Sequence, residues 1–583
     1  MRIAALLKPI PPFDAAPSEV ERRWLAGEGP LVMNPFCRRA VAQACELAAA
    51  VGDGTVTIVT VGPPDAADLV RGAMTSGHQT DVVCDGLLLA DAHAAGADPL
   101  VTARALADAL GRDGGFDLVL TGRAGVDRDA GVVGPQVAEL LGLPFVGGAR
   151  YLSLQRDTLH VRCELDDGWA QVDVELPAVV SCAERLIDPC PGAPVSVPTP
   201  ALRTVTVAGP PAGPSRRGAV ARAAADRAGV LLSGSPDEQI GRARSLLRER
   251  GALAGSATDR AVPPTGGERG AAVAVAVEPE RPETTRELLG AAARLAAGID
   301  GHVVALTVED EAPETLASWG ADTVVRLDGS ELEEDVAAGV TRWAHLVGPR
   351  VVLAPATMWG REVAGRAAAQ LGAGLLASAV ALEWADDDAL GADVPMLGGQ
   401  LVAEVTGDAA PVLVTVRTGA LGLPRARATG PPDVRALKVE ARSRVRVRSR
   451  TRHDDLGALA RAEAVLGVGL GVDREEYLAL SPLLEALGAE LAATRPVVDR
   501  GWLPHARQVG LTGRSIAPRL YVAIGVRGAF EHLIGVSGAG SVLAIHPDRS
   551  APVFHAADIG VVADWHDVVP GLAAALADER YRG

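Results

Sequence analysis

The sequence predicts an α/β protein built from three doubly wound units, each with a parallel sheet between helices. Of the 583 residues, 48% are hydrophobic and only 3% are aromatic. Short apolar runs alternate with longer stretches of small residues at helical spacing. This alternation is typical of buried parallel strands joined by right-handed helical crossovers. The chain is longer than one core usually organises, so several domains are expected.

An internal duplication relates the first two units. Residues 117–123 (DLVLTGR) and 350–356 (RVVLAPA) each read as a strand before a turn and a small-residue helix. Further along, residues 176–181 (LPAVVS) and 410–415 (APVLVT) match in the same order. The offset of roughly 230–250 residues indicates a duplicated domain and not a short solenoid repeat.

Composition suggests where the units begin and end. The predicted segments are a first unit with a C-terminal arm at 1–252, a Gly/Pro-rich linker at 253–270, a second unit at 271–440, a basic connecting arm at 441–462 and a third unit at 463–583. Residues 236–250 have helical spacing, and the linker is interpreted as a passive tether. The basic run at 442–452 is interpreted as a solvated arm or a crossing strand, because the chain as a whole is acidic.

Charge and cysteine content narrow the classes of function. A formal net charge of -17 argues against nucleic acid as a main partner. The six cysteines lie in the N-terminal third and form no CxxC pair, so no metal site is expected. The apolar run at 1–8 is too short for a signal peptide, and no run approaches a membrane span of about 20 residues. A cytoplasmic protein without membrane insertion is therefore expected.

The third unit carries the most specific pattern of the chain. Residues 508–513 read QVGLTG, residues 520–525 form an apolar run, and residues 526–533 read VRGAFEHL. Glycines allow a backbone to approach a ligand closely, and free N–H groups at a helix start favour negative charge. The pattern therefore predicts a site for a phosphate group or the edge of a flavin.

This stretch resembles the FAD domain of the electron transfer flavoprotein alpha subunit, whose pattern reads roughly QVGQTG and then LYxAxGISGAxQHL. The similarity continues through residues 544–548 (AIHPD) and 557–560 (ADIG). The first unit resembles the beta subunit of that family, in residues 33–37 (MNPFC) and in 126–129 (VDRD) after Gly122 and Arg123. Residues 271–420 resemble domain I of the alpha subunit. The resemblance implies a beta–alpha fusion with two nucleotide-hydrolase-like domains and a C-terminal FAD-binding domain.

The resemblance also implies which residues hold FAD. They are Thr494, Arg495, Val509, Gly510, Leu511, Thr512, Arg527, Gly528, Ala529, Phe530, Glu531, His532, His546, Asp564 and Trp565. Arg495 would lie beside the flavin ring, Thr512 near its N5 edge, and His532 at the pyrimidine carbonyl, where they favour negative charge on the ring. Without the resemblance, Arg495 reads as a surface residue, Thr512 as a turn residue, His532 as structural and Asp564 as a helix N-cap.

Five positions depart from the family pattern. Leu511 and Glu531 replace glutamines, Arg527 replaces a serine, His546 replaces an asparagine, and Gly469 or Leu470 occupies the place of an arginine. A lost hydrogen bond typically changes stability by about 1 kcal/mol. Either the redox tuning is altered or FAD binds more weakly, and Arg527 is a candidate to replace the missing charge.

A second nucleotide site is implied in the first unit, for AMP or, less favoured, a second FAD. Its candidate residues are Leu6, Asn34, Pro35, Phe36, Cys37, Val61, Asp127, Asp129, Gly131, Val132, Val133 and Gly134. Residues 130–133 (AGVV) lack the family's side-chain phosphate ligands, so backbone N–H groups would hold a phosphate. An inherited loop that binds nothing is the alternative.

The implied function is an FAD-bound carrier that takes electrons from a flavin-dependent dehydrogenase and passes them to a quinone reductase or another acceptor. Such a carrier has no catalytic residues. The family docks through a leucine in a beta-subunit loop, and here residues 190–195 have a proline near that place, which favours a dedicated partner. Two alternatives remain: a flavin-poor nucleotide- or partner-binding protein, and a component of an electron-bifurcating complex. Fusion of both halves makes a monomer sufficient, because tethering raises their effective concentration.

Overall fold

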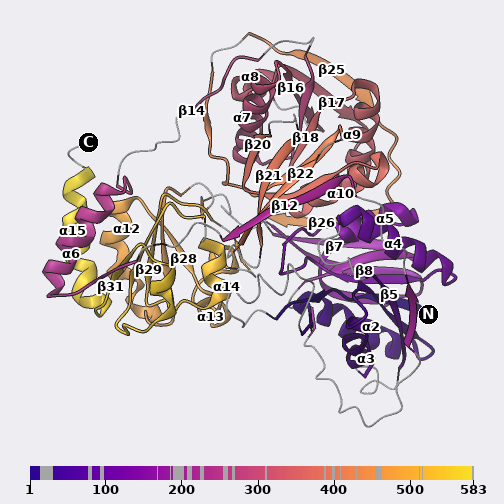
Figure 1. Ribbon diagram of the computed structural model, residues 1–583, viewed down its shortest axis with the longest axis horizontal. Coiled ribbons are helices and arrows are strands. Elements are labelled where there is room, and N and C mark those ends of the chain that lie inside the picture. The colour runs from indigo at the N-terminus through magenta and orange to yellow at the C-terminus, as the bar shows by residue number, and fades with distance from the viewer. Residues whose placement is uncertain are drawn as a thin grey trace.

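The computed structural model consists of three α/β units that form three lobes (Figure 1). It describes residues 1–12, 30–75, 82–91, 98–166, 168–183, 186–187, 202–206, 213–222, 227, 229–253, 260–265, 270–308, 312–385, 389–396, 401–407, 409–427, 430–452, 458–459, 462–510, 513–514, 516–536 and 538–580. The predicted α/β class with several parallel sheets is confirmed. In the described part of the chain, no helix combines the length and the apolar character needed to cross a membrane.

The first unit contains a ten-stranded sheet that is parallel in its first seven strands. The strand order is β11 (Leu202–Thr206), β5 (Val83–Ala90), β4 (Thr55–Gly62), β1 (Arg2–Leu6), β6 (Leu118–Gly122), β10 (Ala178–Cys182), β7 (Phe145–Gln155), β8 (Thr158–Leu165), β9 (Gly168–Glu175) and β26 (Val445–Arg452). A short pair, β2 (Pro9–Ile10) and β3 (Val32–Met33), precedes the first helix.

Helices cover both faces of the first sheet, as a doubly wound unit requires. The core on one face includes residues of α2 (Pro35–Val51) and α3 (Ala66–Met74). The core on the other face includes residues of α4 (Pro99–Arg112) and α5 (Val133–Leu141). Strands such as β6 are buried on both sides, which explains why they read as continuous apolar runs.

The second unit repeats this plan. Its main sheet has the order β19 (Leu375–Ala379), β23 (Val412–Val416), β18 (Val351–Pro355), β15 (Ala272–Ala276), β16 (His302–Thr307), β17 (Thr323–Asp328) and β25 (Asp433–Lys438). A smaller sheet has the order β12 (Ser215–Arg222), β22 (Leu401–Gly407), β21 (Leu390–Met396) and β20 (Ala381–Trp384). The helices are α7 (Pro282–Gly298), α8 (Pro313–Trp319), α9 (Glu333–Val347) and α10 (Met358–Leu371). Within the predicted linker, β14 (Arg260–Ala261) pairs with β24 (Pro424–Arg425), so this part of the segment packs on the second unit.

The two duplicated units exchange strands reciprocally. After β11, the chain leaves the first unit and adds β12 to β22 of the second unit. After β25, the chain leaves the second unit and adds β26 to β9 of the first unit. The basic run predicted as a solvated arm or crossing strand is therefore a crossing strand. Each unit completes the antiparallel hairpins of the other.

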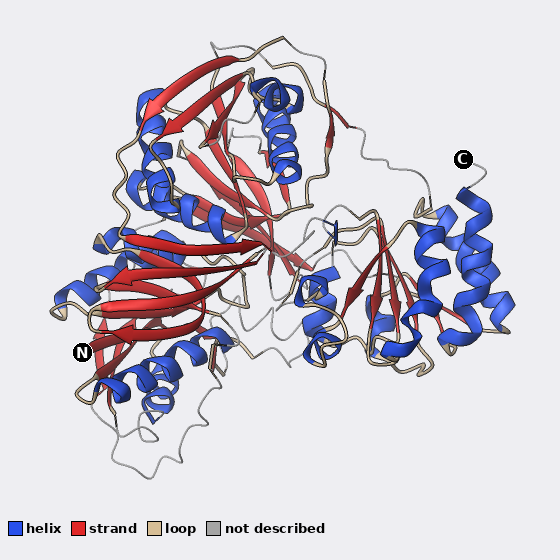
Figure 2. Cartoon of the chain, turned by 180° about the vertical axis from the view of Figure 1, so that it is seen from behind, coloured by secondary structure: helices blue, strands red, loops and turns tan. Residues whose placement is uncertain are grey.

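The third unit has one six-stranded parallel sheet. Its order is β13 (Val230–Leu232), β31 (Ile559–Val561), β30 (Ser541–Ile545), β29 (Leu520–Ile524), β27 (Ala464–Val468) and β28 (Glu490–Ala493). Its helices are α6 (Pro236–Glu249), α12 (Ser481–Leu487), α13 (Arg495–Asp499), α14 (Phe530–Leu533) and α15 (Trp565–Arg580), with short 3-10 turns η3 (Arg474–Leu480), η4 (His505–Arg507), η5 (Ile534–Val536) and η6 (Pro552–Ala556). Figure 2 shows these helices around the strands.

The arm that follows the first unit packs in the third lobe. β13 pairs in parallel with β31, and α6 lies beside α15 (Figure 1). Ile240 and Leu247 of α6 share a core with Leu572 of α15. Ser235 and Glu238 form a capping box at the start of α6, which explains the helix predicted at 236–250. The arm thus ties the first half of the chain to the third unit.

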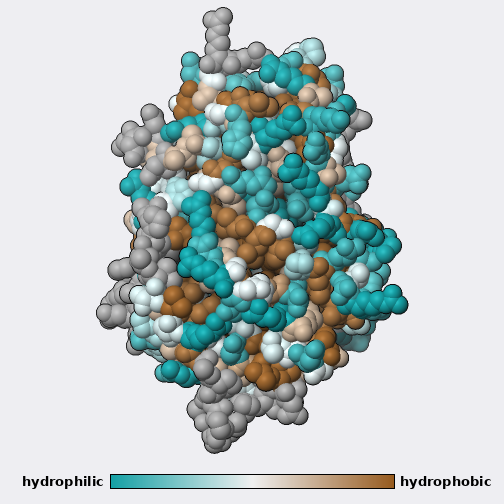
Figure 3. Space-filling view, turned by 90° about the vertical axis from the view of Figure 1, so that its right-hand side faces the viewer, coloured by the Kyte–Doolittle hydropathy of each residue, from teal (hydrophilic) through white to brown (hydrophobic). Residues whose placement is uncertain are grey.

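The surface in Figure 3 alternates between polar and apolar side chains. Apolar atoms form several patches on this face, and polar side chains separate them. Because polar side chains interrupt them, these patches do not by themselves mark a binding site.

Candidate functional site

The third sheet has a topological switch point between β27 and β29. From β27 the chain moves to β28 on one side, and β29, β30 and β31 then follow on the other side. Open parallel sheets bind ligands in the crevice beyond the carboxyl ends of the strands at such a point. The predicted FAD residues follow these ends: Thr494 and Arg495 after β28, residues 527–532 after β29, His546 after β30, and Asp564 and Trp565 after β31. The structure brings them to one edge of the sheet.

Glycines close the two turns at this switch point. A Cβ on Gly469 would lie 2.1 Å from the carbonyl oxygen of Gly525, and a Cβ on Gly471 would lie 2.8 Å from the Cα of Gly525. Gly528 has a φ of 92°, and a Cβ there would lie 2.2 Å from the backbone nitrogen of Val553. A side chain at position 469 would therefore clash with the backbone, whereas Leu470 is 39% exposed.

The turn after residue 508 is held by its own backbone and by the first unit. Gln508 forms a bridge with Ala493, and the N–H of Gly510 donates to the carbonyl of Arg514 at 3.0 Å. The guanidinium of Arg514 donates to the carbonyl of Asp166, between β8 and β9, at 2.5 Å. Val509 is buried beneath the turn. Leu511 and Thr512, two predicted FAD contacts, lie outside the described residues, and their roles stay predictions.

His532 is buried, and both of its ring nitrogens have protein partners. Nδ1 lies 3.0 Å from the carbonyl oxygen of Val509, and Nε2 lies 2.7 Å from the hydroxyl of Tyr521. The carbonyl can only accept, so Nδ1 carries the proton and Nε2 accepts from Tyr521. Burial lowers the pKa of His532 to about 4, although the bond to Val509 opposes this shift. His532 is therefore neutral and anchors the turn, and its contact with a flavin stays a prediction.

Two arginines offer positive charge at this edge. Arg495 is 41% exposed on α13, and its Nε donates to Asp499 at 3.2 Å. Arg527 is exposed, and its charge helps to lower the pKa of Asp548, after the larger effects of the Ser550 hydrogen bonds. Thr494 is buried and donates its N–H to the carbonyl of Val468 at 3.0 Å. A phosphate or a reduced ring at this edge would meet cations.

The remaining predicted contacts have local roles. The carbonyl of Ala529 accepts from the N–H groups of His532 and Leu533. His546 accepts from the N–H of Asp548 through Nδ1 at 3.1 Å. For Phe530 and Glu531, only the helical backbone belongs to the described part of the structure.

Asp564 acts as the cap of α15, which was the alternative interpretation of this residue. Its Oδ1 accepts from the backbone N–H of His566 at 3.0 Å and lies 2.6 Å from His566 Nδ1. The other ring nitrogen lies 2.9 Å from Glu476 Oε1. Hydrogen bonds to Glu476 and Asp564 raise the pKa of His566. Trp565 is buried, and its ring stacks on His566 with 3.8 Å between the ring centroids.

The candidate residues of the first unit also meet at a switch point, between β1 and β6. Leu6 and Val61 lie at the ends of β1 and β4. Asn34 donates to the carbonyl of Ala124 at 2.9 Å and accepts from the N–H of Val126 at 3.1 Å. Lys8 Nζ lies 2.5 Å from Asp127 Oδ1. These contacts fix the loop after β6 around the first turn of α2.

The start of α2 and the start of α5 flank this loop. Pro35 begins α2, and Phe36 and Cys37 are buried beside it. Burial raises the pKa of Cys37, although a hydrogen bond from Asn34 opposes this. Gly134 lies in the first turn of α5, where a Cβ would be 2.9 Å from Phe145. Val132 and Val133 precede it, and Val132 is buried in the core of the second unit.

The second unit differs at the equivalent strand end. Lys8 lies two residues after β1, and Glu278 lies two residues after β15. Glu278 Oε2 accepts from the hydroxyl of Thr357 at 2.8 Å, and Glu278 Oε1 accepts from Arg281 at 3.2 Å. A carboxylate repels a phosphate where a lysine attracts it. Each of these charges already has a partner, Asp127 for Lys8 and Arg281 for Glu278, so the two units differ in the side chain at this strand end and not in its net charge.

The three parallel sheets, two of them in duplicated units, define the class of doubly wound α/β proteins. The family profile described as the electron transfer flavoprotein domain matches residues 24–228 and 275–442, more than half of the chain. The profile described as the electron transfer flavoprotein FAD-binding domain matches residues 458–537. The chain belongs to the electron transfer flavoprotein family.

Curated relatives match part of the chain. Protein FixB of Rhizobium meliloti (strain 1021) is 36% identical over 231 residues, which cover 38% of this chain and 65% of FixB. The electron transfer flavoprotein subunit alpha of Thermoanaerobacterium thermosaccharolyticum is 32% identical over 301 residues, 49% of this chain and 91% of that subunit. Subunit LctC of the lactate dehydrogenase (NAD(+),ferredoxin) of Acetobacterium woodii is 32% identical over 302 residues, 49% of this chain and 72% of LctC.

Some of the residues at the switch point of the third unit suit a flavin nucleotide. The glycine turns, the exposed Arg527 and the half-exposed Arg495 suit an anionic cofactor. The FAD-binding profile covers the same turns. Both ring nitrogens of His532 are occupied by Tyr521 and Val509, so in this arrangement His532 itself has no free N–H for the ring.

Proposed function

We propose that this chain is an FAD-bound electron carrier and not an enzyme that transforms a small substrate. The observation that carries the proposal is the match of the FAD-binding domain to the unit whose switch point is lined by glycine turns and arginines. FAD, when bound, accepts electrons from one partner and gives them to another. The protein's part is to hold the cofactor and to set the charge around it.

The third unit would perform this part with few residues. Arg495 and Arg527 would favour negative charge on the cofactor, since they stand at the carboxyl edge of the sheet. Gly528 would keep the turn after β29 close to η6, where a side chain has no room. Arg514 would hold the 508–514 turn against the first unit.

We further propose that the chain combines a beta-type and an alpha-type half. The electron transfer flavoprotein domain matches both halves, whereas FixB, LctC and the alpha subunit named above cover less than half of the chain. The exchange of β12 and β26 supports two halves that work as one body. A single chain would then suffice where two subunits are otherwise needed. AMP in the first unit is part of this proposal.

The visible spectrum of the purified chain tests the carrier. One FAD released per chain is the expected result. A protein that stays colourless in excess FAD would overturn the proposal and favour a flavin-poor nucleotide- or partner-binding protein. Two FADs per chain would favour the second candidate, a component of an electron-bifurcating complex, to which the NAD(+) and ferredoxin in the name of the LctC enzyme give some support.

The proposed donor is a flavin-dependent dehydrogenase, and the proposed acceptor is a quinone reductase. Stopped-flow mixing of the FAD-loaded chain with a reduced dehydrogenase tests the donor. Bleaching of the flavin absorbance, at a rate that rises with dehydrogenase concentration, is expected. A flavin that dithionite reduces but no dehydrogenase reduces would contradict the donor class and leave the FAD site intact.

A further inference from the structure

Three arginines surround one carboxylate where the two duplicated units meet. Arg361 Nη2 lies 3.0 Å from Asp129 Oδ2, and Arg417 Nη2 lies 3.4 Å from the same oxygen. Arg123, directly after β6, also acts on Asp129 electrostatically. Arg361 belongs to α10, and Arg417 follows β23 of the second unit. We call these three residues the arginine cluster; its cations come from both units.

The arginine cluster carries more positive charge than Asp129 can neutralise. Burial alone would raise the pKa of Asp129, but Arg361, Arg417 and Arg123 hold it below its usual value. For Arg417, burial lowers the pKa, and Asp129 is the carboxylate that opposes this shift, while Arg361 adds to it. Three guanidinium groups and one carboxylate leave an excess of two positive charges. Burying charge without a counter-ion is strongly unfavourable.

Donor groups in the cluster remain unused. The Nε atoms of Arg123, Arg361 and Arg417 are buried and have no hydrogen-bond partner among the described residues. The side chains of Arg361 and Arg417 are 12% and 17% exposed, whereas that of Asp129 is 33% exposed, so solvent reaches the carboxylate. Buried polar groups in proteins are nearly always satisfied, and unsatisfied ones point to a partner.

The backbone around the cluster is held in conformations that cost energy. Asp129 has a φ of 49° and Ser378 a φ of 65°, both in the left-handed region although neither is glycine. Ser378 Oγ donates to the carbonyl of Asp129 at 2.7 Å, and the N–H of Ser378 donates to Thr415 Oγ1 at 2.9 Å. Such strain persists where the surroundings enforce it, and it is enriched at ligand sites.

Gly131 gives the cluster its space. A Cβ on Gly131 would lie 3.0 Å from Arg361 Cδ and 3.2 Å from Arg361 Nη1. The loop that lacks phosphate-binding side chains thus lies directly against a guanidinium of the other unit. The ring of Phe36 lies 5.6 Å from the guanidinium carbon of Arg123, which connects the cluster to the start of α2.

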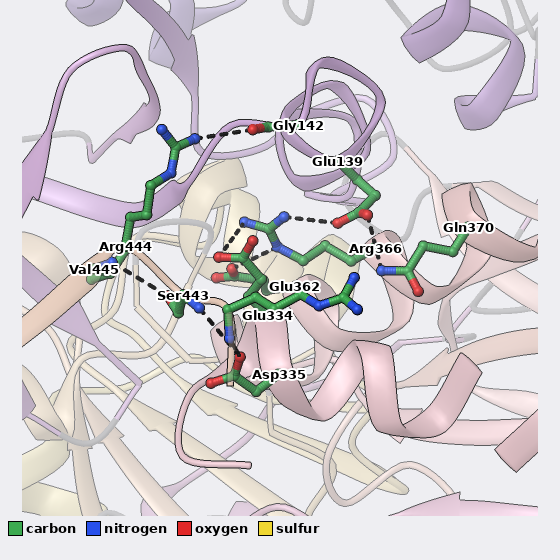
Figure 4. Close-up of polar contacts among 11 residues, drawn as sticks. Glu139, Gly142, Glu334, Asp335, Glu362, Arg366, Gln370, Ser443, Arg444 and Val445 are labelled. Carbon is green, nitrogen blue, oxygen red and sulfur yellow. Dashed lines mark hydrogen bonds and ion pairs between the residues drawn. The ribbon is translucent and has the colours of Figure 1, made fainter. Parts of the chain in front are cut away.

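The neighbouring contact between the units has the opposite charge. Arg366, one turn and a half further along α10, faces the glutamates Glu139, Glu334 and Glu362 (Figure 4). Here three glutamates surround one arginine, whereas in the arginine cluster three arginines surround one carboxylate. A contact that only joins the units would need no such separation of charge.

We propose that Arg123, Arg361 and Arg417 bind a phosphate dianion between the two units. Guanidinium groups recognise phosphate oxygens through paired N–H donors, which suits three arginines better than lysines. The phosphate is either free or part of a nucleotide that lies on the loop after β6. Only the second source rests on the AMP of the proposed function.

The test uses the full chain and titrates inorganic phosphate at constant ionic strength by calorimetry, with chloride as the reference. The wild-type protein is expected to bind phosphate in this titration. Its thermal unfolding midpoint is expected to be higher in phosphate than in chloride. Arg123→Gln is expected to weaken binding at least tenfold. Arg326→Gln, at an exposed arginine paired with Asp328, is the matched control and is expected to bind as wild type.

The variant Asp129→Asn tests whether the arginine cluster binds phosphate or only stabilises the fold. Removing the carboxylate abolishes its repulsion of the anion, so the variant is expected to bind phosphate more tightly even if its stability falls. A structural cluster would lose stability without any gain in phosphate affinity, and that result would overturn the proposal. Equal unfolding midpoints of the wild type in phosphate and chloride would overturn it as well.

Two further titrations identify the source of the phosphate. If AMP binds more tightly than phosphate and adenosine does not compete, a nucleotide phosphate is the ligand. If phosphate and AMP bind equally, the ligand is free phosphate. AMP binding that is insensitive to Arg123→Gln would contradict the site. The FAD content of each sample is read from its spectrum, so a failure here is distinguishable from a failure of the carrier.

Discussion

Arg514 of the third unit donates a hydrogen bond to the backbone carbonyl of Asp166 in the first unit, at 2.5 Å. The carboxylate of Asp166 accepts from the N–H of Met358 at 2.6 Å, at the start of α10 in the second unit. One residue between β8 and β9 therefore contacts both other units. The position of the turn at 508–514 depends on a hairpin more than 300 residues away in the sequence.

Arg514→Gln is expected to loosen this turn. A hydrogen bond from a charged group contributes about 1.5–3 kcal/mol, so the local opening free energy should fall by about that amount. Hydrogen exchange of the amides of Gly510 and Gly513 measures the change. Arg326→Gln controls for loss of an arginine, and equal exchange rates in both variants would contradict the link.

The lowered pKa of His532 leads us to expect that the third unit becomes less stable in acid. Its folded pKa of about 4 lies below the value of about 6.5 for an unfolded histidine. Between these pH values the unfolded state binds the proton, so the contribution to stability is present above pH 6.5 and is lost as the pH falls to 4. The full loss is about 3 kcal/mol. Hydrogen exchange of β29 between pH 7 and pH 4.5 measures it.

The matched variant is His532→Gln, which cannot titrate. Its pH dependence in β29 should be flatter than that of the wild type, although its stability at pH 7 is lower. If both proteins lose the same free energy between pH 7 and pH 4.5, the protons are taken up elsewhere and the assignment to His532 is wrong.

Gly528→Ala is expected to disrupt the turn after β29. The new Cβ would lie 2.2 Å from the nitrogen of Val553, and the φ of 92° is unfavourable for alanine. Gly501 also has a positive φ, of 69°, but open space around its Cβ position. Gly501→Ala thus measures the backbone cost alone, about 1–2 kcal/mol. A larger loss in Gly528→Ala, by urea unfolding, is expected; equal losses would mean that the turn tolerates a side chain.

Sequence patterns predict the parallel sheets but not the partners of the exchanged strands. β6 and β18 are buried on both faces, so their apolar runs reveal them without any partner. β26 is rich in arginine, and it is a strand because β9 supplies its hydrogen bonds. Nothing in residues 445–452 specifies that partner. Long-range pairing of polar edge strands depends on the assembled fold.

The same limit applies to the sites. The turns with Gly510 and Gly528 are predictable, because glycine marks backbone that side chains cannot adopt. The orientation of His532 is not, since it depends on Tyr521 in the adjacent strand. Asp129 reads as a residue of the first unit, yet its two arginine partners lie more than 200 residues away in the sequence. Composition alone does not reveal such partners.

The raised pKa of Glu362 leads us to expect that the contact between the first and second units weakens as the pH rises. Burial raises its pKa to about 8, with Glu333 and Glu334 adding to the effect and Arg366 opposing it. The folded state therefore holds the proton at pH values where the unfolded state has lost it. The contribution to stability is present below about pH 4.5 and is lost as the pH rises to 8. Glu362→Gln, neutral at every pH, should lose less stability than the wild type between pH 6 and pH 9 in urea unfolding.

Arg366→Met is expected to be the most destabilising of these changes. The arginine side chain is 1% exposed, and it lies 2.9 Å from Glu139 of the first unit and 3.0 Å from Glu362 (Figure 4). With a pKa of about 8, Glu362 holds its proton at pH 7, so the charged partner of Arg366 in this argument is Glu139. Removing one partner of a buried ion pair costs about 3–5 kcal/mol. Urea unfolding at pH 7 measures the loss, with Arg326→Met as the exposed control. The double variant Arg366→Met with Glu139→Gln should recover part of it, because fewer unpaired carboxylates remain. A single variant no less stable than the control would mean that the ion pair between Arg366 and Glu139 contributes nothing to stability.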